Sequence, residues 1–208
     1  MVVMVMHDGR MTNAGFFADK PTLVGERVVL RAFAPGDIDA MGAILADPEV
    51  LTLTGSVHTT SEAGGRTAIL DSATRQWYET RAEQPDRLDL AIIERASSAC
   101  VGEAVLNELN RENDSCSFRI LIGPAGRDRG LGTEATRLVL RHAFRTTTLH
   151  RIELEVFAFN PRAQHVYERS GFALEGRRRH AHKFDGEYVD ALTMSILRSE
   201  YLDADGLK

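Results

Sequence analysis

The chain has 208 residues, enough for one domain with a sizeable hydrophobic core. Hydrophobic residues make up 43% and charged residues 26%, as in ordinary soluble globular proteins, and the formal net charge of −5 argues against a general nucleic-acid-binding protein. The two cysteines, Cys100 and Cys116, lack metal-ligand spacing and predict free thiols in a reducing compartment. The N-terminus is a poor signal peptide, and no later run has the length of a membrane span. We therefore predict a soluble, cytoplasmic protein with no membrane or nucleic-acid partner.

Glycine and asparagine residues in the first part of the chain indicate irregular structure there. The rest of the sequence contains no internal repeat and no linker. We expect a tail or irregular lead-in over 1–20, one domain over 21–202, and a C-terminal tail over 203–208.

Hydrophobic periodicity and capping residues define the elements of the first half. A β-rich run predicts a strand over 23–31, and Asp37 is a cap for a helix that ends at Asp47–Pro48. A loop rich in Gly, Ser and Thr is expected over 55–65. Helical spacing then predicts a second helix over 62–81.

In the second half of the sequence, the hydrophobic pattern predicts strands that alternate with helices. Strands are expected over 88–94, 99–106, 115–122 and 151–157, followed by a hairpin over 172–196 with its turn at 184–187. One helix follows the strand over 115–122. Another begins at Asn160–Pro161, where Asn is the cap and Pro the first helical residue, and Gly171 ends it.

The most distinctive segment is Arg127-x-x-Gly130-x-Gly132, between the strand over 115–122 and the next helix. Glycines let successive backbone N–H groups converge on one anion, and the start of a helix adds unpaired donors and partial positive charge. Arg127 and Arg129 add full charges, so a pyrophosphate suits the loop. The structural alternative is a glycine-rich connection with two solvated arginines. A Walker A loop is excluded because its Gly-Lys-Ser/Thr ending is absent.

This loop resembles the acetyl-CoA pyrophosphate loop of the GNAT superfamily of N-acetyltransferases. A second match is Asn160-x-x-Ala163-x-x-x-Tyr167-x-x-x-Gly171-Phe172, and matching stretches run from about Leu23 to about Tyr201. The sequence of these stretches is most similar to that of the ribosomal-protein-alanine N-acetyltransferase (RimJ/RimL-type) branch. The resemblance implies an α+β fold, in which a central, strongly twisted mixed sheet is splayed in the middle and flanked by helices.

The resemblance implies acetyl-CoA as cosubstrate and an amine as acceptor, with no metal. It also makes a homodimer an expected assembly, although the sequence defines no interface. The expected cofactor-binding residues are Leu121, Ile122, Arg127, Asp128, Arg129, Gly130, Leu131, Gly132, Thr133, Asn160 and Ala163. A backbone N–H from the end of the central strand, over 121–123, is a candidate oxyanion contact.

Tyr167 is the candidate general acid, because the family's tyrosine at this position protonates the departing CoA thiolate. A phenol can donate a proton and still be neutral at pH 7. Asn160 lies about two helical turns earlier on nearly the same face, where the family's asparagine contacts the pantetheine arm. The structural alternatives are a packed core tyrosine and an asparagine that only caps the helix.

Glu103 is the candidate general base, because it shares a strand face with Val101 and Val105 and partial burial raises the pKa of a carboxyl. The alternative is a solvated glutamate on an edge strand. The early helical region usually forms a wall of the acceptor site in the family, so Trp77 and Tyr78 are candidate substrate contacts or ordinary core aromatics.

The branch resemblance favours a protein or peptide N-terminal α-amine as acceptor, attacked directly without a covalent enzyme intermediate. The alternative is a small-molecule amine such as a polyamine, amino acid or antibiotic, because related folds exchange acceptors through loop variation. A non-catalytic acyl-CoA-binding module is the hypothesis from another class. The basic run over 177–183 is expected to be a solvated strand face, and the histidines form no ligand motif.

Overall fold

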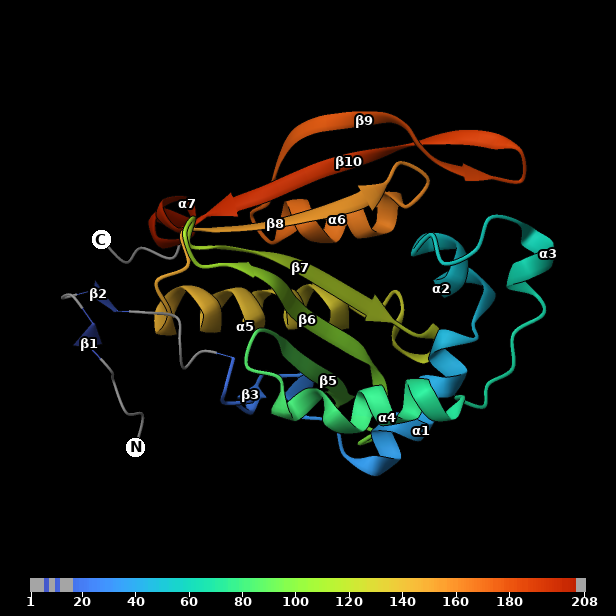
Figure 1. Cartoon of the computed structure of the whole chain (residues 1–208), viewed down its shortest axis with the longest axis horizontal. Coiled ribbons are helices and arrows are strands. Elements are labelled where there is room, and N and C mark those ends of the chain that lie inside the picture. Colours follow the sequence, from blue (N-terminus) through green and yellow to red (C-terminus); the bar gives the residue numbers. More distant parts are fainter. Residues whose placement is uncertain (1–5, 8–9, 12–16, 205–208) are drawn as a thin grey trace.

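The computed structural model describes residues 6–7, 10–11 and 17–204. An eight-stranded sheet in the order β3-β4-β5-β6-β7-β8-β10-β9 dominates it, with helices on both faces (Figure 1). Only the β7–β8 pair among these strands is parallel, so the sheet is mixed and the α+β prediction is confirmed. None of the described helices has the length and apolarity needed to cross a membrane.

The strands of the large sheet are β3 (Leu23–Val24), β4 (Val28–Arg31), β5 (Leu88–Glu94), β6 (Cys100–Asn110), β7 (Ser115–Ile122), β8 (Arg151–Phe157), β9 (Ala173–Phe184) and β10 (Glu187–Leu197). The helices are α1 (Pro35–Leu45), α2 (Pro48–Leu53), α3 (Thr60–Ala63), α4 (Ser72–Thr80), α5 (Leu131–Thr146), α6 (Pro161–Arg169) and α7 (Arg198–Ala204). Short 3₁₀ turns lie at Arg81–Glu83 and Pro124–Gly126.

Most predicted strands and the cap of the later helix agree closely with the structure. The run over 23–31 is instead two antiparallel strands, β3 and β4. The N-cap of α1 is Ala34 rather than Asp37, which lies in the first turn and accepts from the Ala34 N–H at 2.7 Å. β5, β7 and β8 have the expected bounds, and β8 alternates buried apolar residues with charged ones on its other face. The Asn160 side chain accepts from the Ala163 N–H at 3.0 Å and so caps α6. Both cysteines are free, with Cys116 buried and Cys100 half-buried.

Several predictions in the first half are wrong. The helix expected over 62–81 is two helices, because Gly64 and Gly65 end α3 and Asp71 caps the new helix α4 through the Thr74 N–H at 2.8 Å. Asp47–Pro48 ends α1 but also starts α2, whose cap is the Asp47 side chain. The sequence reasoning also missed α7.

The predicted lead-in over 1–20 lies mostly outside the described residues, as do residues 205–208 of the predicted C-terminal tail. Two short strands, β1 (Met6–His7) and β2 (Arg10–Met11), pair with each other. Phe17 is fully buried in the main core, and the Lys20 ammonium donates to the carbonyls of Gln84 and Arg87 at 2.8 and 2.6 Å. Residues 17–20 therefore pack against the domain.

The sheet splits between β7 and β8. The two strands pair only from Ser115–Ser117 with Arg151–Glu153, and beyond this they diverge (Figure 1). The predicted splay in the middle of the sheet is thus confirmed. A main core packs α5 and α6 against one face of the sheet, and a smaller core packs α1 and α4 against the other face of β5, β6 and β7.

Candidate active site

A cleft of about 450 Å³ occupies the split between β7 and β8. The ends of both strands, the glycine-rich loop, the start of α5, one side of α6 and part of α2 form its walls. Its lining includes ten of the eleven predicted cofactor contacts, namely Leu121, Ile122, Arg127, Asp128, Gly130, Leu131, Gly132, Thr133, Asn160 and Ala163, together with Tyr167. Segments far apart in sequence, from Val50 on α2 to Tyr167 on α6, thus meet at one cleft.

The glycine-rich loop ends in a residue that caps α5. Gly130 has φ +73°, a left-handed conformation that glycine adopts without strain, and it precedes the first helical residue, Leu131. The first N–H groups of a helix have no intrahelical acceptor. In α5 these groups, on Leu131, Gly132 and Thr133, belong to residues that line the cleft. The helix start can therefore bind an anion through backbone donors and its dipole.

The two arginines of the glycine-rich loop are ion-paired within the protein, whereas the sequence predicted them as free charges beside the anion. Arg127 is ion-paired with Asp47 and Glu49, and Arg129 is ion-paired with Glu94. Arg129 is also the one predicted cofactor contact that does not line the cleft; it borders a separate hollow beside Arg27 and Arg95. Carboxylates on neighbouring segments thus offset both charges, and the backbone donors are the better-supported anion ligands.

Tyr167 lies on α6 with its ring packed against Phe118 and Phe172, at centroid distances of 6.4 and 5.8 Å. It is 6% exposed, and burial raises the pKa of its phenol to about 12. Within the described residues its hydroxyl has no hydrogen-bond partner, although the residue lines the cleft. A protonated, unpaired phenol at a cavity can donate a proton to a bound group.

Glu103 lies in the interior of the sheet, since β6 pairs with β5 on one side and β7 on the other. The alternative of a solvated edge-strand glutamate is therefore wrong, and the residue is 3% exposed. Its Oε2 accepts from the Tyr78 hydroxyl at 3.2 Å and from Arg81 Nη1 at 3.1 Å, and Oε1 faces Arg119 Nη2 at 3.6 Å. Glu103 does not line the cleft.

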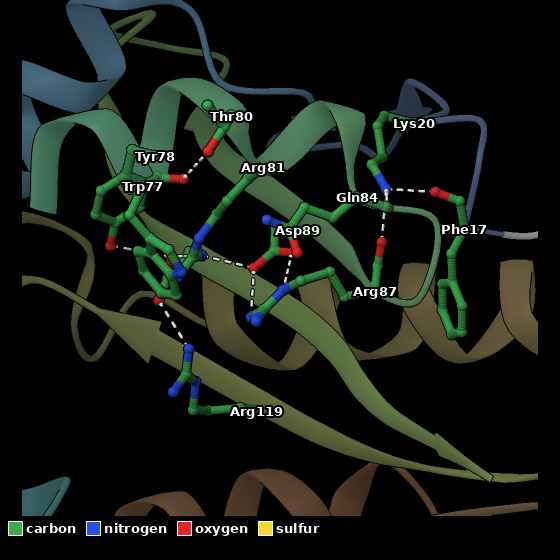
Figure 2. Close-up of polar contacts among 11 residues, drawn as sticks. Phe17, Lys20, Trp77, Tyr78, Thr80, Arg81, Gln84, Arg87, Asp89 and Arg119 are labelled. Carbon is green, nitrogen blue, oxygen red and sulfur yellow. Dashed lines mark hydrogen bonds and ion pairs between the residues drawn. The ribbon is translucent and has the colours of Figure 1, made fainter. Parts of the chain in front are cut away.

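Arg81 is the centre of this buried network, which Figure 2 shows between α4 and the sheet. Its Nη1 donates to Asp89 at 2.6 Å, Arg87 donates to the same carboxylate at 2.6 Å, and the Trp77 ring stacks on the guanidinium at 3.0 Å from the ring centroid. Burial lowers the pKa of Arg81, while burial and the nearby Glu103 raise the pKa of Tyr78. Neither Trp77 nor Tyr78, the two predicted substrate contacts, lines the cleft.

Sequence reasoning missed Arg81, Asp89 and Arg119. Asp89 did carry a signal, because it interrupts an otherwise apolar strand that is buried along its whole length. Arg119 likewise interrupts the apolar end of β7 and lines the cleft. Arg81 is the last residue of the helix predicted over 62–81 and has no comparable pattern. Among the residues that the structure describes, no group of three or more His, Cys, Asp or Glu side chains is arranged to hold a metal ion.

Residues 27–173 match the Acetyltransferase (GNAT) domain, which is more than half of the chain. The fold, the split sheet and the loop at the start of α5 agree with this match, and the chain belongs to the GNAT family. It is an acetyl-CoA-dependent N-acetyltransferase.

Several of the relatives are named for small amines. Spermidine N(1)-acetyltransferase of Escherichia coli is 31% identical over 143 residues, which cover 63% of this chain and 77% of that protein. The Vibrio cholerae enzyme of the same name is 34% identical over 112 residues, covering 54% and 65%. An L-amino acid N-acetyltransferase of E. coli is 27% identical over 178 residues, covering 82% and 98%.

The fold is similar to that of a V. cholerae spermidine N-acetyltransferase solved in complex with CoA and spermine. The TM-score is 0.72 at 24% identity, and the match covers 86% of this chain and 99% of that one. These relatives support membership of the GNAT family, but they give no support for the ribosomal-protein branch that the sequence motifs favoured.

Proposed function

We propose that the chain acetylates a primary amine of a small molecule rather than a protein N-terminus, with Tyr167 as general acid. The relatives support this acceptor class, because they are named for spermidine and for L-amino acids. The observation that carries the role of Tyr167 is its unpaired hydroxyl at the same cleft as the anion-binding helix start. The pyrophosphate of acetyl-CoA would bind at the first turn of α5, and its thioester would reach into the split.

In the proposed reaction the neutral amine attacks the thioester carbonyl and a tetrahedral intermediate forms. When this intermediate collapses, the C–S bond breaks and the CoA thiolate takes the phenolic proton of Tyr167. The phenolate is then reprotonated from solvent. Direct attack is favoured over a cysteine intermediate, because burial raises the pKa of Cys116 to about 12 and of Cys100 to about 11, so both stay as weakly nucleophilic thiols.

Glu103, the sequence-based candidate base, is better supported as a positioning residue. Its two oxygens face a phenol and two guanidinium groups, and it has no place on the cleft surface. A water molecule in the cleft would then carry away the proton of the amine. The α-amino group of a peptide has an unperturbed pKa of about 7.7–8.0 and a lysine amine about 10.4, so the acceptor's own pKa should set how far the rate rises with pH.

The test is CoA release from acetyl-CoA with a panel of acceptors. It contains spermidine and spermine, free L-amino acids, amino-sugar antibiotics, short peptides with free N-termini, and the same peptides blocked but carrying lysine. Turnover of at least one small amine at a kcat/KM well above that of every peptide is the expected result. Turnover confined to free peptide N-termini would overturn the proposal.

A further inference from the structure

Two oppositely charged side chains stand at the mouth of the split, on the two strands that form it. The last paired residues are Ser117 and Glu153, and two positions further along each strand are Arg119 and Glu155. Side chains two residues apart share a face of a sheet, so both project on the same side. Both line the cleft, and no ion pair joins them.

Arg119 differs from the other two arginines of the cleft. Arg127 is neutralised by Asp47 and Glu49, and Arg162 is paired with Glu49 and with Asp128 at 3.4 Å. The side chain of Arg119 is 51% exposed, and its one ion-pair partner among the described residues is Glu103, at 3.6 Å. A guanidinium has five N–H donors in a planar fork. Most of the donors of Arg119 are therefore available to a ligand.

Arg119 also stands close to the proposed reacting centre. The ring of Tyr167 packs against Phe118, the residue before Arg119, on the opposite face of β7. The general acid and the guanidinium therefore approach the same part of the split from its two sides. The carboxylate of Glu103 accepts from Arg81 and Tyr78 and lies 3.6 Å from Arg119 Nη2, so it orients the guanidinium of Arg119.

We propose that Arg119 selects an acceptor whose amine lies next to a carboxylate, as in a free α-amino acid. This inference rests on the proposed function and names its substrate class. Arg119 would bind the carboxylate through paired, charge-assisted hydrogen bonds, which leaves the neighbouring amine at the thioester. Glu155 would accept from the amine as it arrives, since Arg178 occupies only its Oε2. A polyamine would instead bring further positive charge against Arg119, at a cost in affinity.

The experiment compares kcat/KM for each L-amino acid and for its amide, which differ only in the carboxylate. Arg119→Gln should lower the acid-to-amide ratio of kcat/KM by about tenfold or more relative to the wild type, the size expected of a hydrogen-bonded charged contact. Arg119→Lys, which keeps the charge without the fork, should lower this ratio by an intermediate amount. Dividing the variant ratio by the wild-type ratio cancels the different pKa values of the two amines.

Arg177→Gln is the matched control, because Arg177 is 58% exposed, pairs with Asp190 and lies outside the cleft. It should leave the acid-to-amide ratio unchanged. Thermal unfolding and acetyl-CoA affinity of each variant would confirm that the fold and the cofactor site are intact. An acid-to-amide ratio that Arg119→Gln does not change would overturn the inference. Spermidine as the best acceptor would overturn it too but leave the proposed function standing, whereas turnover of peptides alone would overturn both.

Discussion

Two buried tyrosines lie on opposite faces of the sheet and differ in what their hydroxyls meet. Tyr78 is 2% exposed and belongs to the core beneath α1 and α4, while Tyr167 is 6% exposed and belongs to the core beneath α5 and α6. The hydroxyl of Tyr78 donates to Glu103, whereas that of Tyr167 has no partner among the described residues and lines the cleft. Burial alone therefore does not mark a catalytic side chain. The unpaired hydroxyl at the cavity is what supports our proposal of Tyr167 as general acid.

The surroundings of the two tyrosines differ in the same way. Around Tyr78 three charged side chains are almost fully enclosed, namely Arg81, Asp89 and Glu103. Around Tyr167 the neighbours are apolar rings and an open space. We infer that the first region stabilises the sheet and positions Arg119, while the second region carries out the reaction. Each of the following variants separates these roles.

The largest effect is expected from Arg81→Met. The substitution leaves Asp89 and Glu103 buried without their shared guanidinium, and removal of one partner of a buried ion pair costs about 3–5 kcal/mol. Urea unfolding monitored by circular dichroism would measure the loss. Arg177→Gln, on the surface, should cost less than about 1 kcal/mol. A loss for Arg81→Met as small as that of the surface control would show that water solvates the network.

Gly130→Val tests the anion site at the start of α5. A side chain at φ +73° is strained, and its Cβ would lie 3.1 Å from Arg27 Nη1, so the first N–H groups of the helix should lose their alignment. Hydrogen bonds to a charged group are worth about 1.5–3 kcal/mol each, so the loss of one or two should weaken acetyl-CoA binding by roughly a hundredfold. Isothermal titration calorimetry would measure the affinity.

Gly186→Val provides the control for backbone strain. Gly186 has φ +88° in the β9–β10 turn, with nothing within 4 Å of an added Cβ. The two valine variants should lose similar stability, but only Gly130→Val should lose acetyl-CoA affinity. Equal affinities in both variants would remove the loop from the cofactor site.

The sequence predicted the cleft well because its elements are local. Arg127-x-x-Gly130-x-Gly132 and Asn160 through Tyr167 each lie within one turn or helix, so residue spacing alone places their side chains on one face. The strand over 115–122 is also recognisable from its apolar residues, of which Cys116, Phe118 and Leu121 are buried. Two features differed: Arg129 does not line the cleft, and both loop arginines are ion-paired, because Asp47, Glu49 and Glu94 come from segments far away in sequence.

The sequence did not predict the buried network, because its members come from α4, the 3₁₀ turn that begins at Arg81, β5, β6 and β7. From the sequence, Glu103 could be interpreted as a base or as a solvated residue. Its actual environment depends on a hydrogen bond from Arg81, which lies 22 residues away in sequence. The family resemblance made Trp77 and Tyr78 candidate contacts in the wall of the acceptor site. In the structure Tyr78 packs in the core and Trp77 stacks on Arg81. Long-range pairing of charges has no periodic signal in a single sequence.

Tyr167→Phe compared with Tyr78→Phe tests the difference between the two hydroxyls directly. Loss of a general acid lowers kcat by about 10²-fold or more, and the acetyl-CoA affinity should be unchanged because the phenyl ring still packs. Tyr78→Phe removes one donor to the charged Glu103 and should cost about 1.5–3 kcal/mol of stability, with kcat within a factor of about two. Pre-steady-state measurement of the chemical step would exclude masking by product release. Equal kcat values for the two variants would remove Tyr167 from its role.

The smallest effect is expected from a surface ion pair that resembles the buried network in composition. Arg151 donates to both oxygens of Glu175, at 2.6 and 2.5 Å, and Ser195 donates to the same carboxylate at 2.8 Å. Glu175 is 40% exposed, and these donors, the Arg151 hydrogen bond first, lower its pKa from 4.5 to about 2.

Because the folded-state pKa of Glu175 is depressed, its contribution to stability is present above pH 4.5 and is lost as the pH falls toward 2. Solvent screens this exposed pair, so Glu175→Gln should cost about 0.2–1 kcal/mol at pH 7 and nothing near pH 2. Urea unfolding at a series of pH values would measure both limits. A cost as large as that of Arg81→Met would mean that exposure does not distinguish the two groups of charges, and a cost that persisted at pH 2 would come from packing rather than from charge.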